Sequence, residues 1–241
     1  MDQGKKIVLS KRMTAVADMV SKQNTVADIG CDHGFVSIYL IQHGICKKVL
    51  AMDVNDGPLE RAKEHISMRG LSDYIEVRKS DGMEKIGMDE KPEADAAIIA
   101  GMGGRLTVRI LSDGLKKARL MQEIILQPQS EIFLVRRFLM ENGFFIAEEN
   151  MVLDEGKYYQ ILKAVPDRKS NESKQETLSA VQEQFGPILL QQRNPVLQEY
   201  LERELDKFDH ICRQIEGNDT GTIAQISQKQ KIIREALTYF H

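Results

Sequence analysis

Acidic residues and glycines alternate near the start of the chain in a pattern that can bind a nucleoside. Asp28 stands two residues before Gly30, and Asp32 lies between Gly30 and Gly34. About twenty residues further on, Asp53 ends a second short apolar run. Glycines let the backbone approach a ligand closely, and an acid at the end of the next strand accepts hydrogen bonds from ribose hydroxyls. The spacing therefore predicts a nucleoside-containing ligand.

The sign of the charges selects among such ligands. Asp28 and Asp32 would repel a pyrophosphate in a poorly screened cleft, and no third glycine follows at the spacing that a pyrophosphate needs. S-adenosylmethionine instead carries a sulfonium, an ammonium and a ribose diol, which all suit carboxylates. We therefore expect S-adenosylmethionine as the cofactor. The alternative is a purely structural turn in another doubly wound protein.

Further polar and glycine clusters follow later apolar runs, where the strands of a parallel sheet would end. The ligand of an open parallel sheet lies at the carboxyl ends of its strands. We expect Asp53 to accept from the ribose diol and Asp81 to accept from the adenine amino group, unless either is an ordinary turn acid. The expected cofactor-binding residues are Asp28, Gly30, Cys31, His33, Gly34, Asp53, Val54, Asp81, Gly82, Ala100, Gly101, Met102, Gly103 and Gln127.

The run Gly101-Met102-Gly103-Gly104 lacks the Asn/Asp-Pro-Pro-aromatic tetrapeptide of amino-group methylases. It offers space and backbone N–H groups, which suits an acceptor with an exposed lone pair, such as a ring nitrogen. No proton then has to be removed first, so catalysis is mostly alignment, worth roughly 7–11 kcal/mol. Acids such as Asp32 would stabilise the positive charge that arrives on the base. The expected catalytic residues are Arg12, Asp32, His33 and Met102, unless His33 only begins a helix.

The composition is that of an ordinary globular protein without a dominant charge. The chain has 241 residues, 42% of them hydrophobic and 29% charged, which allows one full domain with an appendage. Its net charge of −3 means that local basic patches would have to hold any nucleic acid. The three cysteines lack metal-ligand spacing, so we expect a reduced, cytoplasmic protein without a metal. Neither a membrane span nor a signal peptide is expected.

Hydrophobic periodicity predicts an α/β domain over residues 1–166. An amphipathic helix over 9–20 comes first, apolar runs then alternate with helical segments, and a turn signal over 154–157 joins the last two strands. Five strand–helix units and this hairpin predict a doubly wound, Rossmann-like, mostly parallel sheet. The expected strands are 26–29, 49–52, 74–78, 94–100, 123–126, 144–153 and 158–165, and the other helices 35–42, 59–68, 105–115 and 131–141.

A polar linker is expected from residue 166 to about 176, followed by a second, helical domain, so that the division falls at 167–241. Beyond the linker, apolar residues recur every three or four positions, which is the period of a helix. A shorter helix over 178–190 comes first. The Gly/Asn/Asp-rich break over 217–221 then predicts that two helices fold back as an antiparallel coiled-coil hairpin.

Six short motifs carry a family resemblance. They are Leu9-Ser10-Lys11-Arg12, Asp28-Ile29-Gly30-Cys31-Asp32-His33, Asp81-Gly82, Ala100-Gly101-Met102-Gly103-Gly104, Leu126-Gln127-Pro128 and Lys157-Tyr158-Tyr159. Over about residues 9–165 the chain resembles the bacterial tRNA (adenine-22) N(1)-methyltransferases, a class I S-adenosylmethionine-dependent family with a coiled-coil C-terminal domain. The helical tail matches in architecture only. Gln129 and Gln160 stand where Asn and Glu are expected, which affects substrate handling if either contacts the acceptor base.

The resemblance implies methyl transfer to ring nitrogen 1 of one adenine, position 22, in the D-arm region of tRNA. That base must first be exposed, at a cost of a few kcal/mol. The alternatives are a class I methyltransferase for a protein or a small metabolite, and a non-catalytic S-adenosylmethionine-binding interaction protein. We expect a monomer or weak dimer. Basic residues that could contact the RNA backbone are Lys5, Lys6, Lys11, Arg12, Arg105, Arg109, Arg136 and Arg137.

Overall fold

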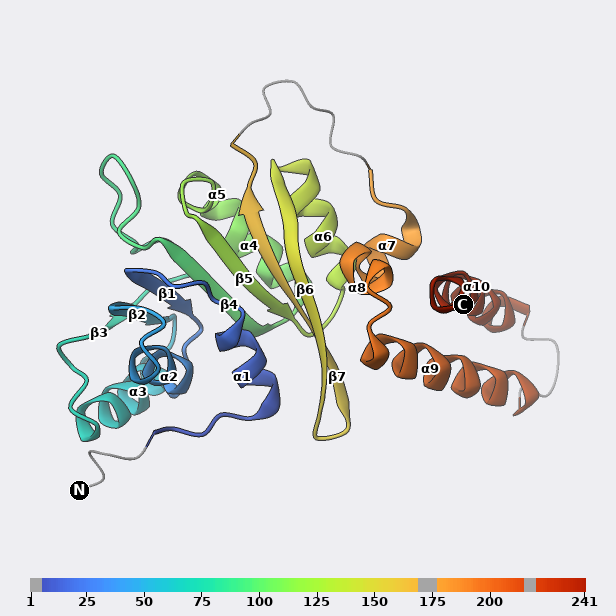
Figure 1. The fold of residues 1–241 in the computed structure, drawn as a ribbon, viewed down its shortest axis with the longest axis horizontal. Helices are drawn as coiled ribbons and strands as arrows, with labels where there is room; N and C mark the ends of the chain where they lie inside the picture. Colours follow the sequence, from blue (N-terminus) through green and yellow to red (C-terminus); the bar gives the residue numbers. More distant parts are fainter. Residues whose placement is uncertain (1–5, 169–176, 215–219) are drawn as a thin grey trace.

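The computed structural model describes residues 6–168, 177–214 and 220–241. A sheet carries helices on both faces, and a further group of helices lies beside the β6–β7 edge (Figure 1). The elements in chain order are α1 (Lys11–Asp18), β1 (Thr25–Ile29), α2 (Phe35–Gln42), β2 (Lys48–Asp53), α3 (Asp56–Met68), β3 (Ile75–Lys79), β4 (Ala96–Met102), α4 (Gly104–Asp113), α5 (Leu115–Ala118), β5 (Glu123–Pro128), α6 (Ile132–Glu141), β6 (Phe144–Asp154), β7 (Lys157–Pro166), α7 (Ala180–Phe185), α8 (Pro187–Gln191), α9 (Pro195–Gln214), α10 (Thr220–Leu237) and a final 3₁₀ turn (Thr238–Phe240).

The seven-stranded sheet has the order β3-β2-β1-β4-β5-β7-β6. Strands β1 to β5 pair in parallel, and β7 is antiparallel to both of its neighbours. The chain therefore begins in the middle of the sheet, builds one edge, and returns to build the other. The predicted doubly wound, mostly parallel sheet is confirmed.

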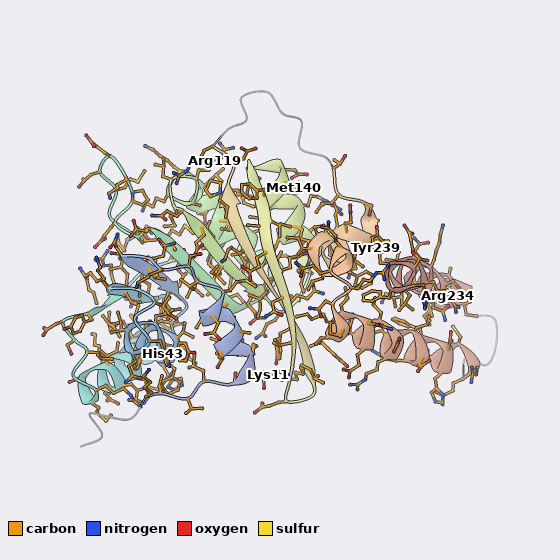
Figure 2. All side chains as sticks on the ribbon, in the orientation of Figure 1. Lys11, His43, Arg119, Met140, Arg234 and Tyr239 are labelled. Atoms are coloured by element: carbon orange, nitrogen blue, oxygen red, sulfur yellow. The ribbon has the colours of Figure 1, made fainter. Side chains whose placement is uncertain are left out.

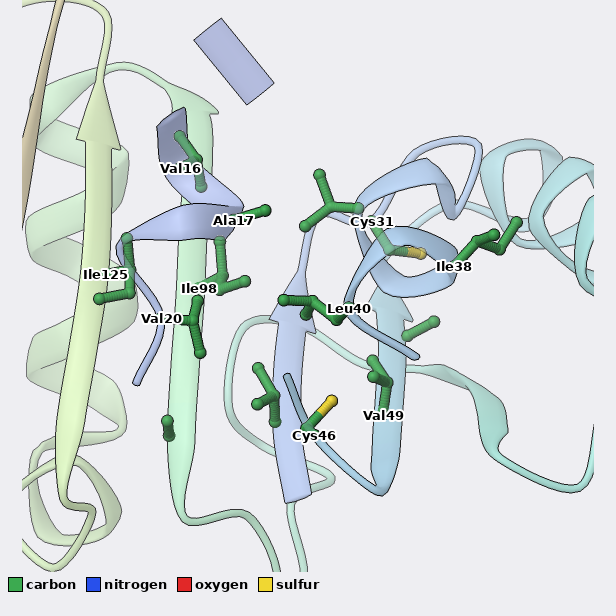
Figure 3. Close-up of a cluster of buried hydrophobic side chains, with 14 of the residues drawn as sticks. Val16, Ala17, Val20, Cys31, Ile38, Leu40, Cys46, Val49, Ile98 and Ile125 are labelled. Carbon is green, nitrogen blue, oxygen red and sulfur yellow. The ribbon is translucent and has the colours of Figure 1, made fainter. Parts of the chain in front are cut away.

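Alternate side chains of each central strand enter two separate hydrophobic cores. On β1, Val26 packs with α1, α2 and α3, whereas Ala27 packs with α4, α5 and α6 on the opposite face. Figure 3 shows the first core, where Val16 of α1 lies near Ile125 of β5. Burial on both faces explains why these strands are continuous apolar runs. The two cores hold the strand ends in fixed positions.

The connection after β3 differs from the prediction of five strand–helix units. No helix follows β3, and residues 80–95 form turns instead. The Ser80 hydroxyl donates to the carbonyl of Gly82 at 2.9 Å and accepts from the backbone N–H of Lys85 at 3.1 Å. Two glycines and a proline within this segment oppose a helix.

Two predicted helices end earlier than expected because a glycine interrupts each. The helix expected over 178–190 is divided into α7 and α8 at Gly186, and Pro187 begins α8 because it needs no backbone N–H there. The helix expected over 105–115 ends at Asp113, and the short α5 follows Gly114.

Helices α9 and α10 form the predicted antiparallel hairpin. The Lys229 ammonium in the middle of α10 lies 5.6 Å from the centre of the Phe208 ring in the second half of α9. At the other end, Arg193, just before α9, donates to the carbonyl of His241 at 3.2 Å. The apolar residues of both helices share a core with α7 and α8. The turn predicted over 217–221 and the predicted linker lie largely outside the described residues, and coiled-coil packing stays a prediction.

Candidate functional site

The register of the sheet brings four strand ends to one edge. Asp28 of β1 lies beside Ala51 of β2 and Ile98 of β4, and Ala100 of β4 lies beside Gln127 of β5. Parallel strands point the same way, so the loops that follow β1, β2, β4 and β5 meet at this edge. We call it the strand-end edge. It contains most of the residues that the sequence predicts for the cofactor.

The loop after β1 turns sharply against the end of β2. The backbone N–H groups of Gly30 and Cys31 both donate to the carbonyl of Met52, at 2.7 and 3.0 Å. Gly30 has φ +77°, and a Cβ at this position would overlap the Met102 side chain at the end of β4. The left-handed backbone conformation therefore favours glycine here, and a larger residue would also have to displace the flexible end of Met102.

Three carboxylates surround the Cys31 thiol at the strand-end edge. Burial raises the pKa of Cys31, and the negative charges of Asp28, Asp53 and Asp32 raise it further. Asp32 lies near the Arg61 guanidinium, whereas Asp28 and Asp53 repel one another, and an external cation would relieve that repulsion. The edge therefore fits a sulfonium and an ammonium group and disfavours a pyrophosphate.

Asp28 lies inside this edge rather than on its open rim. Its side chain is 4% exposed, and its Oδ2 accepts from the Ser37 hydroxyl of α2 at 2.6 Å. Burial raises the pKa of Asp28 to about 6, opposed by the hydrogen bonds from Ser37 and reinforced by the charge of Asp53. Asp28 thus holds the start of α2 against β1 and contributes negative charge to the strand-end edge from a buried position. The sequence did not single out Ser37.

Asp53 and Asp81 follow β2 and β3, as predicted. Asp53 is half-buried, and its Oδ1 accepts from the backbone N–H of Asn55 at 2.9 Å. Asp81 is exposed and accepts two hydrogen bonds from Arg109, at 2.9 and 3.1 Å. These bonds lower the pKa of Asp81. Of the neighbouring predicted residues, Val54 is exposed, and Gly82 is buried against Ile110 of α4.

A second group of residues borders the glycine loop from α3. Asp32 has φ +46°, and its carboxylate lies 3.6 Å from His33 Nε2 and 3.6 Å from Arg61 Nη2. His65 Nδ1 forms a 3.0 Å hydrogen bond with the carbonyl of His33. The rings of His33, Phe35 and His65 stack with centroids 4.8–5.7 Å apart. The sequence did not identify Arg61, Phe35 or His65 as site residues. Phe35 follows the loop directly as the first residue of α2, whereas Arg61 and His65 reach the loop through the packing of α3.

At the ends of β4 and β5, Arg12 is held from three directions. Its Nη1 donates to Gln127 Oε1 at 2.7 Å, and its guanidinium lies 5.1 Å from the centre of the Tyr159 ring. Its backbone N–H donates to Asp154 of the β6–β7 hairpin at 2.9 Å. The register of β4 shifts at Gly101, which has φ +79°, and a Cβ there would lie 3.7 Å from Arg12 Nη1 and 3.8 Å from Gln129 Nε2. The structure thus adds Tyr159 and Asp154 to the predicted site.

Of the other residues predicted here, Ala100 and Met102 are half-buried, and the carbonyl of Gly103 accepts from Thr107 at the start of α4. Gln129 is exposed next to Gly101. Gln160 lies elsewhere and is buried against Arg136. The concern that Gln160 contacts an acceptor base is therefore removed.

The basic residues predicted to contact RNA divide into exposed and buried ones. Lys11 is exposed at the start of α1, where Figure 2 labels it. The side chain of Arg105 is 80% exposed and pairs with Glu131, while Arg137 pairs with Glu183. Arg136 has no exposed surface at all, so the expectation that it contacts RNA is wrong. Among the others, Lys6 is exposed, and Lys5 lies outside the described residues.

Two kinds of site are absent from the part of the chain that the structure describes. In residues 6–168, 177–214 and 220–241, no group of three or more His, Cys, Asp or Glu side chains is arranged to hold a metal ion. Within the same residues, no helix combines the length and hydrophobicity that crossing a membrane requires.

Comparison with known proteins gives consistent relatives. A family model described as a methyltransferase domain matches residues 9–162. The tRNA (adenine(22)-N(1))-methyltransferase of Bacillus subtilis is 30% identical over 96% of this chain and 98% of its own length. A Streptococcus pneumoniae protein solved with S-adenosyl-L-methionine is 31% identical, with a TM-score of 0.83 over 97% of this chain and all of that one. The B. subtilis enzyme TrmK superposes with a TM-score of 0.78 at 28% identity, over 95% and 99% of the two chains. Together with the acidic strand-end edge, these matches show that the chain belongs to the tRNA (adenine(22)-N(1))-methyltransferase family of methyltransferase-domain proteins.

Proposed function

We propose that this protein transfers a methyl group from S-adenosylmethionine to ring nitrogen 1 of adenine 22 in tRNA. The observation that carries the proposal is the convergence of Asp28, Asp32 and Asp53 on Cys31 at the carboxyl ends of a parallel sheet. A cationic nucleoside cofactor relieves the repulsion among these acids. The relatives' names supply the acceptor.

On the cofactor side, the roles follow from position. Asp53, at the end of β2, accepts from the ribose diol, a charge-assisted pair. Gly30 and Gly34 leave room for the methionine portion. Asp81 accepts from the adenine amino group while sharing its carboxylate with Arg109, and Gly82 packs beside the ring. S-adenosylmethionine supplies the methyl group and the positive charge that moves with it to the acceptor.

On the acceptor side, we place the flat base beside the bulge at Gly101, close to Met102 and to the group formed by Arg12, Gln127 and Tyr159. Ring nitrogen 1 of adenine carries a free lone pair at neutral pH, so none of these residues has to remove a proton. Their work is alignment of the base with the methyl group. Asp32 stabilises the positive charge that the base acquires.

Exposed or half-exposed cations surround the strand-end edge and would neutralise RNA phosphates. They are Lys11, Arg105 and Arg109. Residues 1–166 form the catalytic domain and 167–241 the helical domain, and the protein acts as a monomer or weak dimer.

The test is methyl transfer to unmodified tRNA, followed by digestion and mass spectrometry of the nucleosides. The expected product is 1-methyladenosine, and tRNA with guanine in place of adenine 22 should remain unmethylated. A methyl group on a protein or a metabolite instead would place the activity in the same class with another acceptor. Saturable cofactor binding without turnover on any acceptor would make the protein a binding module, and either result would overturn the proposal.

A further inference from the structure

Arg136 of α6 is the largest side chain in the described residues without any exposed surface. Its Nε donates to Glu149 Oε1 of β6 at 2.9 Å, and its Nη2 lies 2.7 Å from the same oxygen in an ion pair. Nη2 donates to Gln160 Oε1 of β7 at 2.6 Å. Its Nη1 donates to the carbonyls of Glu183 and Gln184 in α7, at 2.9 and 3.2 Å. One guanidinium therefore joins the sheet to the first helix of the C-terminal group.

Glu149 completes the connection from the sheet. Its Oε2 accepts from the backbone N–H groups of Ile188 and Leu189 in the first turn of α8, at 2.9 and 3.4 Å. Both N–H groups are ones that a helix cannot satisfy internally. The ion pair thus binds carbonyls of α7 through the cation and N–H groups of α8 through the anion.

Gly186 lies at the corner between α7 and α8, and it touches the same pair. It has φ +97°, and a Cβ there would overlap both carboxylate oxygens of Glu149 and approach Arg136 Nη2. The backbone corner is therefore seated directly on the ion pair. We call Arg136, Glu149, Gln160 and Gly186 the corner lock.

The corner lock fixes the relative position of the sheet, α7 and α8 more than it adds to the free energy of unfolding. A buried ion pair is often matched in free energy by apolar residues of the same volume, but it has only one arrangement in which every donor and acceptor is satisfied. The corner lock contains one cation, Arg136, and one anion, Glu149, because Gln160 is neutral, so the two side-chain charges balance. Exposed pairs also join this helical group to α6 and the sheet, through Arg137 with Glu183 and through Tyr158 with Glu199, and the shared core adds apolar packing. Such contacts constrain the position of α7 and α8 less than the buried pair does.

We infer that Arg136 is a positioning residue for the proposed methyl transfer. Through the corner lock it fixes the α9–α10 hairpin at one angle to the strand-end edge, so that tRNA bound along the hairpin presents its adenine at the Gly101 bulge. The inference rests on the proposed function. Exposed cations on the hairpin that could meet phosphates are Lys207, Arg213, Lys229, Lys231 and Arg234; Figure 2 labels Arg234. Two contact areas on one RNA reinforce each other most when their separation matches the span between the two RNA segments, and the gain is lost when the geometry prevents both from binding at once.

The first experiment measures the angle without using activity. Cys31 and Cys46 are buried, and burial raises the pKa of Cys46 to about 12, so thiol labels select the half-buried Cys212 of α9. A second spin label is placed on α3 by Glu60→Cys, and pulsed electron resonance gives the distance distribution. We expect one narrow distance in the parent and a broadened one in Arg136→Met. An equally narrow distance in Arg136→Met would overturn the inference.

The matched control is Arg119→Met. Arg119, labelled in Figure 2, donates to the carbonyl of Asn142 at 2.9 Å. It therefore contacts the residue that follows the C-terminal end of α6, and not the corner lock. It should keep the narrow distance and the parent's kinetics. If Arg136→Met does not fold, Glu149→Gln replaces it, because the amide keeps the shape and removes the charge.

The second experiment separates positioning from general damage. In Arg136→Met we expect kcat/KM for unmodified tRNA to fall about 100-fold, the scale of a displaced substrate. The dissociation constant and stoichiometry for S-adenosylmethionine should stay within twofold, and Arg136→Lys should restore part of the loss. Unchanged kinetics with tRNA, or equal loss of cofactor binding, would overturn the inference while leaving the proposed function standing. No methylation of tRNA by the parent protein would overturn both.

Discussion

The carboxylates of the strand-end edge and the carboxylate of Glu149 lie in opposite surroundings. At the strand-end edge, Asp28 and Asp53 repel one another beside Cys31, whereas Asp32 lies near Arg61. In the corner lock, Glu149 receives Arg136 on one oxygen and two backbone N–H groups on the other. A buried acid with its own cation holds structure, whereas acids that repel one another mark the place of an external cation.

The largest effect should come from breaking the compensated pair. Arg136→Met leaves Glu149 buried without its cation, and we expect the free energy of unfolding to fall by about 3–5 kcal/mol. Arg137→Met, one residue along α6, removes only a half-exposed pair with Glu183 and should cost less than about 1 kcal/mol. Urea unfolding of both variants measures the difference. Equal losses would show that burial of the pair is unimportant.

The second effect concerns the uncompensated acids and appears as a pH dependence. The pKa of Asp28 is raised from 3.8 to about 6 by burial, so the folded protein holds a proton there that the unfolded chain releases. Stability from this group is complete below about pH 4 and is lost as the pH rises through about 6. The shift corresponds to about 3 kcal/mol.

Asp28→Asn should remove this slope, because the amide can still accept from Ser37 but does not ionise. Urea unfolding at pH 4.5 and 7.5 in the absence of cofactor compares the two proteins. S-adenosylmethionine should bind the parent more tightly as the pH rises through about 6, and this gain should be absent from the variant. A parent whose stability rises over that interval faster than the variant's would refute the assignment.

The third effect tests the acid at the end of β2. Asp53→Asn replaces a charge-assisted bond to the ribose diol with a neutral one, and about 2 kcal/mol of binding should be lost, a roughly 30-fold rise in the dissociation constant. Isothermal titration with S-adenosylmethionine measures it. Asp56→Asn is the control. Asp56 lies three residues after Asp53 and forms an exposed ion pair with Lys79. An unchanged constant in Asp53→Asn would remove Asp53 from the site.

The smallest effect concerns the exposed cations. Arg105→Gln should leave cofactor binding unchanged and reduce the slope of log affinity for tRNA against log salt by about 0.7–0.9, the value of one phosphate contact. Arg119→Gln, at the end of α5 and just before the start of β5, should leave the slope unchanged. Equal slopes for Arg105→Gln and the parent would show that Arg105 makes no phosphate contact.

The strand-end edge could be predicted because its signals are local. Asp28, Gly30 and Asp53 follow apolar runs, and the sheet register then brings them together whatever lies elsewhere in the chain. The corner lock could not be predicted in this way. Arg136 has the spacing of a surface residue on α6, and its burial depends on α7, 47 residues further along the chain. The helix expected over 178–190 was carried through Gly186 and Pro187, and only the fold shows that the chain breaks there and that Gly186 packs against the ion pair.

The contacts of Arg12 show the same limit. Arg12 lies 115 residues from Gln127 and 142 from Asp154, and no local pattern connects the three. The motif Lys157-Tyr158-Tyr159 indicated importance without a role. The role follows from the antiparallel hairpin, which carries Tyr159 back to the start of α1.

Calorimetric titration of the folded protein with S-adenosylmethionine tests the central claim most directly, with a nicotinamide dinucleotide as the comparison. The acidic strand-end edge predicts saturation at one cofactor per chain with a matching thermal shift, and no binding of the dinucleotide. Absence of heat and thermal shift with S-adenosylmethionine, or saturation by the dinucleotide, would contradict it.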